Sequence, residues 1–433
     1  MMTTRLLPHR PATAVLGLAA ALVAGPIAAP AHAASSRVLA LDGSTIRSKT
    51  LPGSELAGAD AAPRAGAAAV SASAARARAP KKKKAKKKPY DLTVVRKAIN
   101  KAGGAPNRRL AARAALTSVD AVYRASPKSS QAKRELEAVL KNTTIMARGN
   151  RITAGRMLML TETLKRNAEW WKQKRSTGSG QRVQFAGSQM VWQYYPGSGM
   201  QLQWLGTFGT GNGLYYSGAA HAGELKSLVD EAIRLAVPRS GGIAWEYFFP
   251  FGGGSPPWVS GMAEATGIQV FSRASTKFAV ADYLAKAKEA MTILQTPPPA
   301  GVQVVESTGT HFLIYSYAPG QKVLNAMNQT VNGLYAYVLA APDDVDARLL
   351  FLSGLQWLDA NVNRYDTGKW TLYQLGGPQA DVHYHTVAKD FLKTLCALLK
   401  TDANTPGGGP SGAFPSTRIC AAADTWTKYL AKK

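Results

Sequence analysis

Hydrophobic side chains recur at helical spacing over most of the chain. Val95, Ala98 and Ile99 share one helical face, and Leu116 and Val119 repeat the pattern in the following segment. Gly/Pro-rich stretches interrupt this periodicity and mark the ends of helices. The same spacing predicts further helices over residues 220–236, 262–271, 280–294, 323–339, 344–358 and 387–399.

Short extended segments lie between the predicted helices. Alternation predicts strands at 182–185 and 190–195, and two more at 302–306 and 311–315 that flank a turn as in a hairpin. We therefore expect a mainly α fold, an (α/α) toroid or barrel with short β-hairpins and long aromatic-rich loops that carry the site. No internal sequence repeat is strong enough to prove the toroid.

The N-terminus has the pattern of an export signal. A short basic start precedes the apolar run 13–24, and Ala31 and Ala33 are small residues at the two positions that a signal peptidase reads. We predict cleavage after Ala33 and a secreted or cell-envelope protein; the alternative is an uncleaved membrane anchor. No later apolar run reaches the roughly 18 residues of a membrane span, so we expect no span after cleavage.

Residues 34–90 differ sharply from the rest in composition. Ala, Ser, Gly and Lys dominate, and 13 basic residues against 3 acidic ones give a net charge of +10. Such a segment buries little apolar surface, which predicts a disordered linker. Its densest part, Lys81–Lys88, would attract an envelope polyanion. A plain solvated tether is the alternative.

Composition excludes several classes of protein. Of the 433 residues, 46% are hydrophobic, which excludes a wholly disordered chain. The net charge is +27, of which +15 belongs to residues 91–433, so the folded part favours an anionic ligand. Two cysteines are too few for a disulfide scaffold or a cysteine-rich zinc site. Export favours a Cys396–Cys420 disulfide over two buried thiols.

Three loop regions hold most of the Tyr, Trp and Gly residues: 194–204, 245–258 and 365–385. Aromatic faces stack on the C–H surfaces of sugars, and glycines let the backbone approach a chain ligand closely. The alternative is that these rings only cap the core. Whole clusters in Gly/Pro-rich loops favour binding, because functional residues concentrate in loops.

A family resemblance rests on these same segments. The runs YYPGSGMQLQ, WEYFFPFGGGSPPWVSGMAEATG, YSYAPGQKVLNAMNQTVNGLY and NRYDTGKWTLYQL followed by HYHT resemble the C-terminal domain of D-glucuronyl C5-epimerases. The resemblance is clearest from Trp258 to Leu399. It implies an (α/α) toroid over residues 91–433, with 91–180 as its N-terminal helical part. It also implies activity on uronic acid residues of an acidic polysaccharide.

Epimerisation at C5 removes the proton alpha to the uronate carboxylate and returns one to the opposite face, which requires an acid/base group on each face. Tyrosine can serve if nearby cations lower its pKa from about 10. The family's tyrosines match Tyr315, Tyr373 and Tyr384. Ile314 stands where the family has Glu, and Glu246 is our candidate for the missing carboxylate, with an Arg-paired structural role as the alternative.

Other residues of the three loop regions are candidates for binding the polysaccharide. No metal or organic cofactor is required in principle, and we expect no specific nucleic-acid partner. His383 replaces the family's Asp; on a strand it would point, with the second histidine, away from the tyrosine between them. A polysaccharide lyase or a non-catalytic binder of acidic glycan is the alternative to an epimerase. The substrate-binding candidates are Tyr195, Trp245, Trp258, Asn325, Arg364, His383 and His385.

Overall fold

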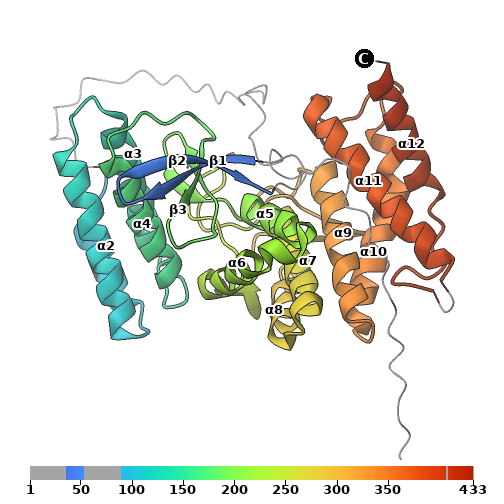
Figure 1. Ribbon diagram of the computed structural model, residues 1–433, viewed down its shortest axis with the longest axis horizontal. Helices are drawn as coiled ribbons and strands as arrows, with labels where there is room; N and C mark the ends of the chain where they lie inside the picture. The colour runs from blue at the N-terminus through green and yellow to red at the C-terminus, as the bar shows by residue number, and fades with distance from the viewer. Residues whose placement is uncertain (1–35, 53–88, 406–407, 433) are drawn as a thin grey trace, which may run out of the picture.

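The computed structural model describes residues 36–52, 89–405 and 408–432, and most of them are helical (Figure 1). The predicted mainly α class with short hairpins is confirmed, whereas the closed ring of a toroid is not. The helices are α1 (Leu92–Lys101), α2 (Pro106–Ala125), α3 (Gln131–Arg148), α4 (Met157–Lys172), α5 (Trp204–Tyr216), α6 (Ala222–Leu235), α7 (Gly261–Phe278), α8 (Ala281–Met291), α9 (Leu324–Ala340), α10 (Val345–Asn361), α11 (Val382–Ala403) and α12 (Thr417–Ala431).

The helices from α5 onward form four successive pairs. In each pair the second helix packs on the first, and α5, α7, α9 and α11 pack against one another in chain order. Asn325 and Asn328 of α9 donate to the carbonyls of Tyr384 and Ala388 of α11, so these two helices run parallel. Their N-terminal ends therefore lie side by side.

The sequence pattern does not predict α5, because four of its 13 residues are glycine. Close packing explains why glycine is used there. A Cβ on Gly211 would lie 2.9 Å from Val270 of α7, closer than carbon atoms normally approach. The helix is buried on all sides, so burial offsets the poor helix propensity of glycine.

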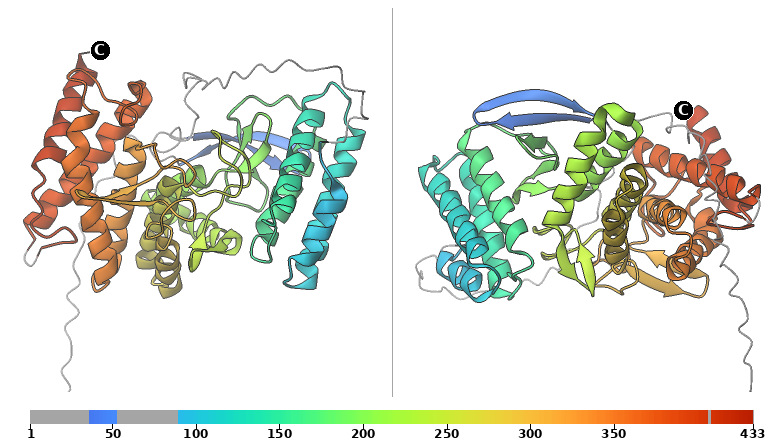
Figure 2. Two further views of the ribbon diagram at one scale, coloured as in Figure 1. Left: turned by 180° about the vertical axis from the view of Figure 1, so that it is seen from behind. Right: turned by 60° about the horizontal axis from the view of Figure 1, so that its bottom comes forward.

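The helices α1–α4 form a separate layer in which α2 packs on α4 and α1 on α3. This layer and the α11–α12 pair lie at opposite ends of the molecule in all views (Figures 1 and 2). The aromatic loops lie between these two ends of the molecule.

A five-stranded sheet, ordered β2-β1-β3-β4-β5, includes a segment that we expected to be disordered linker. β1 (Ser36–Asp42) and β2 (Thr45–Leu51) form a hairpin, and β1 pairs in parallel with β3 (Arg182–Phe185). Val38 and Leu41 are buried there, so this part of the linker prediction is wrong. The prediction used the average composition of residues 34–90, which is rich in Ala and Lys. That average hides a short segment whose hydrophobic residues alternate and which pairs with a neighbouring strand.

The other strands are short. β4 (Trp192–Tyr195) and β5 (Gly199–Leu202) complete the five-stranded sheet, and two hairpins pair β6 (Val237–Arg239) with β7 (Gly242–Ala244) and β8 (Gln303–Glu306) with β9 (Gly309–Phe312). The predicted signal peptide and the Lys81–Lys88 run lie outside the described residues. Within those residues, no helix is both long and apolar enough to cross a membrane.

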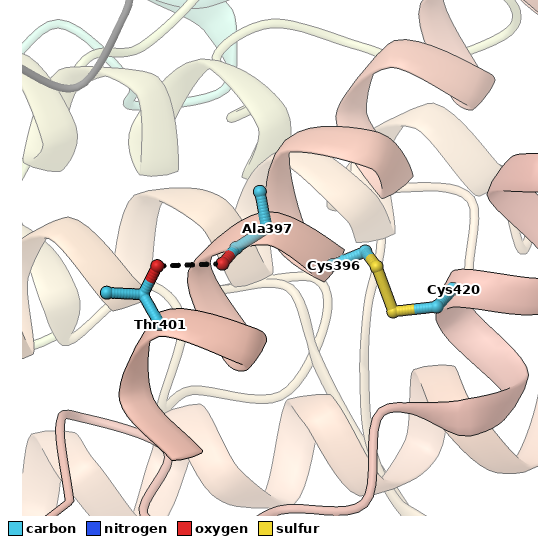
Figure 3. The surroundings of a disulfide bond; sticks show 4 residues. All are labelled: Cys396, Ala397, Thr401 and Cys420. Carbon is cyan, nitrogen blue, oxygen red and sulfur yellow. Dashed lines mark hydrogen bonds between the residues drawn. A yellow bond between two sulfur atoms is a disulfide. The ribbon is translucent and has the colours of Figure 1, made fainter. Parts of the chain in front are cut away.

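The predicted disulfide is present. Cys396 of α11 is bonded to Cys420 of α12, with a Cα–Cα distance of 5.1 Å (Figure 3). One turn further along α11, the Thr401 hydroxyl donates to the Ala397 carbonyl at 3.0 Å. The covalent link closes a 24-residue separation and joins the last two helices.

Candidate functional site

Two of the three candidate tyrosines meet where α9 and α11 begin. The rings of Tyr373 and Tyr384 lie 4.8 Å apart, edge to face. Asn325, in the first turn of α9, donates to the Tyr384 carbonyl at 3.3 Å, and the backbone N–H of Leu324 donates to the Tyr373 carbonyl at 3.2 Å. Tyr373 is half-buried and Tyr384 is buried.

Tyr384 lies on a helix, not on the strand that we assumed for it and its histidine neighbours. Asp381 caps α11 by accepting from the Tyr384 N–H at 2.8 Å. His385 faces the core: its ring stacks on Trp370 at 3.7 Å, and its Nδ1 lies 2.9 Å from the Thr371 hydroxyl. It is fully buried, which places it among structural residues instead of substrate-binding ones. His383 is exposed.

The third tyrosine belongs to an aromatic cluster built around Trp258. Tyr315 packs edge-on to Trp258 at 5.5 Å and stacks on Tyr317 at 5.4 Å. Phe251 covers another side of Trp258 at 5.8 Å. The Trp258 indole N–H is satisfied by the Phe249 carbonyl at 2.7 Å, while Tyr315, Tyr317 and Phe251 are only half-buried. Epimerisation would require the candidate tyrosines to reach a single sugar ring, and this convergence stays a prediction.

Tyr195 extends this cluster from the first aromatic loop. Its ring packs on Phe249 with the centroids 4.5 Å apart, and it is half-buried. Glu135 of α3 holds the loop in place: it accepts from the Tyr194 hydroxyl at 2.8 Å and from the N–H groups of Gly197 and Gly199 at 2.8 and 3.1 Å. Positive φ angles of 77° at both glycines make this turn possible.

The carboxylate of Glu246 is bound by two arginine side chains. Arg156 binds its carboxylate with two hydrogen bonds of 2.6 and 2.7 Å, and Arg239 adds a third at 2.6 Å. The side chain of Glu246 is fully buried. This geometry corresponds to the Arg-paired alternative, because two guanidinium groups occupy both oxygens of the carboxylate.

The two remaining candidates of this region, Trp245 and Arg364, both have partners within the protein. Trp245 is fully buried against Phe208, with its indole N–H donated to the Ala232 carbonyl, so it belongs to the core instead of lining a binding surface. Arg364 is exposed and donates to the Asn361 amide oxygen at 2.7 Å.

Glu306, the other carboxylate near the matched segments, is also engaged. Burial would raise its pKa, but hydrogen bonds from Lys322 and the Trp357 indole N–H outweigh burial and lower the pKa below its usual value. Buried beside it, His311 packs on Trp357 at 4.3 Å, and desolvation lowers the pKa of His311 to about 3. Both groups therefore keep one charge state near neutral pH.

Glu264, in the first turn of α7, is a buried carboxyl that the sequence analysis missed. Its Oε1 accepts a hydrogen bond from the backbone N–H of Trp245 at 2.9 Å, and its Oε2 has no hydrogen-bond partner among the described residues. Complete burial raises the pKa of Glu264 to about 8. A Glu beside small apolar residues in SGMAEATG is the signal that marks it. The described residues contain no cluster of three or more His, Cys, Asp or Glu that could hold a metal ion.

Comparison with known families confirms the resemblance found in the sequence. Residues 240–404, under half of the chain, match the family model described as D-glucuronyl C5-epimerase C-terminus. This segment contains Tyr315, Tyr373, Tyr384 and Asn325 but excludes the helices α1–α6 and α12. No curated protein matches the chain.

Two solved structures are similar over part of their length. The endo-beta-1,4-glucanase CMCax from Acetobacter xylinum shares 11% identity over 52% of this chain and 88% of its own, with a TM-score of 0.30. The Lin0763 protein from Listeria innocua shares 8% identity over 79% of this chain and 97% of its own, with a TM-score of 0.32. At these scores the likeness carries no argument about function.

Proposed function

We propose that the chain is a secreted D-glucuronyl C5-epimerase-like enzyme that acts on uronic acid residues of an acidic polysaccharide. The observation that carries this proposal is the meeting of Tyr373 and Tyr384 at 4.8 Å inside the segment that matches the epimerase family. The successive helix pairs α5–α12 are the parts from which an (α/α) toroid would be built. The disulfide between α11 and α12 suits an exported protein.

The proposed chemistry needs no group beyond the chain itself. The proton at C5 is acidic because it is alpha to the carboxylate; one tyrosinate removes it and a second tyrosine returns a proton to the opposite face. The Oδ1 of Asn325 has no partner among the described residues, and it would accept from a sugar hydroxyl beside Tyr384. The exposed guanidinium of Arg364, on the turn that precedes Tyr373, is a candidate to hold the uronate.

The aromatic cluster supplies a surface for neighbouring sugars. Tyr195, Phe251, Tyr315 and Tyr317 are all half-buried, so each of these residues is partly exposed to solvent. Such rings stack on the C–H faces of pyranoses. Trp258 lies behind them and fixes their positions through ring contacts with Phe251, Tyr315 and Tyr317.

A specific observation favours the non-catalytic binder as a second candidate. Ile314 stands at the position of the family's Glu and is buried, and Glu246 is neutralised by Arg156 and Arg239. A protein that kept the aromatic surface and lost this carboxylate would bind a uronate chain without exchanging its C5 proton.

The test is incubation of the exported protein with a panel of uronate polymers in heavy water, followed by proton NMR. Loss of the C5–H signal without chain cleavage supports the epimerase. Ultraviolet absorbance from an unsaturated uronate would instead identify a lyase. Binding without exchange on any polymer would replace the enzyme by the binder, and neither binding nor exchange would reject both candidates.

A further inference from the structure

Positive charge is concentrated in one part of the molecule. Residues 91–175, which contain α1–α4, have 19 Lys and Arg against 6 Asp and Glu, a net charge of +13. Residues 176–433 have 19 against 17, a net charge of +2. The excess charge of the folded part therefore belongs almost entirely to a layer outside the segment that matches the epimerase family.

The surface of this layer is more basic than its composition. Thirteen of the 19 basic residues are exposed, whereas none of the six acidic residues is. Asp120 and Glu135 are buried, and Glu162 and Glu169 are half-buried beside Arg166. An anionic chain that approached α1–α4 would therefore meet basic groups without opposing exposed carboxylates.

One helix of the layer lies along the aromatic loops. Near the start of α3, Glu135 holds the turn 194–199. In its middle, Asn142 donates its side-chain N–H to the Phe248 carbonyl, and just beyond its end Arg151 donates to the Pro256 carbonyl. Helix α3 and the segment just after it are thus in contact with two of the three aromatic loops.

A row of exposed basic side chains follows the same helix. Arg134, Lys141 and Arg148 are each exposed, and within the described residues none of them forms an ion pair. They are seven residues apart, so successive members lie about 10 Å apart on one face. Arg134 and Lys141 directly precede Glu135 and Asn142 in the chain. Since each residue turns a helix by about 100°, the basic row lies about 100° around α3 from the face that contacts the loops.

We infer that this row, which we call the α3 stripe, is a subsite for the acidic polysaccharide chain beyond the sugar held at the tyrosines. The inference rests on the proposed function for the identity of the chain. A spacing of about 10 Å is comparable to two pyranose rings in an extended polymer. A polymer with one uronate in each disaccharide would therefore present one carboxylate to each member of the stripe.

The surroundings of the stripe favour a polysaccharide over single-stranded nucleic acid. Proteins that bind single strands without sequence preference place aromatic rings among the basic groups so that bases can stack. The only large exposed side chain among the described positions of α3 besides the charged ones is Ile145, which has no π face. The rings are instead gathered in the loops beside α3, where a sugar would stack.

The stripe can be tested with a charge-matched pair of variants. One variant carries Arg134→Gln, Lys141→Gln and Arg148→Gln. The control carries Lys393→Gln, Lys400→Gln and Lys428→Gln, which are exposed on α11 and α12 at the other end of the molecule. Both lose three charges, so a difference between them reports position and not net charge.

The probe is an unsulfated polymer of alternating glucuronate and N-acetylglucosamine, with its disaccharide and octasaccharide. For the polymer and the octasaccharide we expect the stripe variant to bind at least tenfold more weakly than the control at low salt. The slope of its log affinity against log salt concentration should also be smaller, by the amount expected for the loss of up to about three charge contacts. For the disaccharide the two variants should bind equally. If exchange is measurable, KM on the polymer should rise and kcat should not change.

The outcomes separate this inference from the proposed function. Equal polymer affinity in both variants overturns the stripe even if C5 exchange is found. A selective loss of affinity in the stripe variant without exchange on any polymer supports the stripe and rejects the enzyme. Tighter binding of single-stranded DNA than of any glycan, lost selectively in the stripe variant, overturns the choice of partner. Circular dichroism and melting temperature confirm that both variants are folded.

Discussion

The α1–α4 layer and the α5–α12 pairs are both helical, yet they use polar residues differently. In the first region the basic residues lie mostly on the surface and the acidic ones do not, while in the second the two signs nearly balance. Both regions bury polar groups, and those of the second include Glu264, His311 and three asparagines of α9. In the proposed function, the first region attracts an anionic chain through its exposed charge, and the second holds and transforms it.

The strongest way to break this division is to remove a hydroxyl from each region. Tyr384→Phe should lower C5 exchange by about 10²-fold or more and leave polymer affinity within a few-fold, because an acid/base group acts in the transition state and not in binding. Tyr123→Phe in the α1–α4 layer, which loses a hydrogen bond to Glu137, should leave the rate unchanged. Exchange rates come from proton NMR in heavy water. An active Tyr384→Phe enzyme would remove that residue from the mechanism.

The ion pair that joins the two regions should control stability. Arg156 begins α4, and Glu246 belongs to the aromatic loop region. Glu246→Gln leaves two partly buried guanidinium groups without a carboxylate and should cost about 3–5 kcal/mol in the free energy of unfolding. Glu169→Gln, which removes a more exposed carboxylate beside Arg166, should cost less than about 1 kcal/mol. Urea unfolding measures both, and equal costs would contradict a special role for the buried pair.

The disulfide should stabilise the end of the molecule that lies farthest from the stripe. Replacing Cys420 by Ser removes a link across 24 residues and should cost about 3 kcal/mol by the loop-closure argument. Polymer affinity should not change. Addition of a thiol reductant should lower the melting temperature of the wild type and not that of the variant. If the variant binds polymer as weakly as the stripe variant, then the two ends are not independent.

Glu264 should make the stability of the α5–α12 region depend on pH. Its pKa is about 8 in the folded protein, above the value of an exposed Glu, so folding favours its protonated form. Its contribution to stability is complete below about pH 4.5 and is lost as the pH rises toward 8, by at most about 1.4 kcal/mol per pH unit. Glu264→Gln should flatten this slope in urea unfolding between pH 5 and pH 8. Parallel slopes in variant and wild type would show that another group titrates.

The sequence pattern predicts helices well where apolar residues repeat and poorly where packing replaces periodicity. The residues of α9 and α10 were predicted within a few positions at each end. α5 was missed because its glycines serve the close approach of α7, which only the folded neighbour reveals. The start of α11 differs from the strand considered for the residues around Tyr384, because Asp381 caps a helix there.

The site was partly predictable, and the resemblance supplied what the physical pattern could not. Tyr373 and Tyr384 are 11 residues apart, and no spacing rule would place their rings together without the family pattern. Glu246 is paired with Arg156 and Arg239, which are 90 and 7 residues away in the chain. The pair with Arg156 depends on how helices and loops are assembled, and no local signal in the sequence encodes it.

The parallel pairing of β1 with β3 has a consequence for the order in which the protein folds. Leu39 faces Val183, 144 residues further along the chain. Synthesis from the N-terminus produces the β1–β2 hairpin first, but the strand that β1 pairs with follows only after α1–α4. The hairpin must therefore wait for β3, with β1 offering an unpaired edge meanwhile. Completion of this sheet therefore depends on a long-range contact, which links the first described residues to the part of the chain that follows α4.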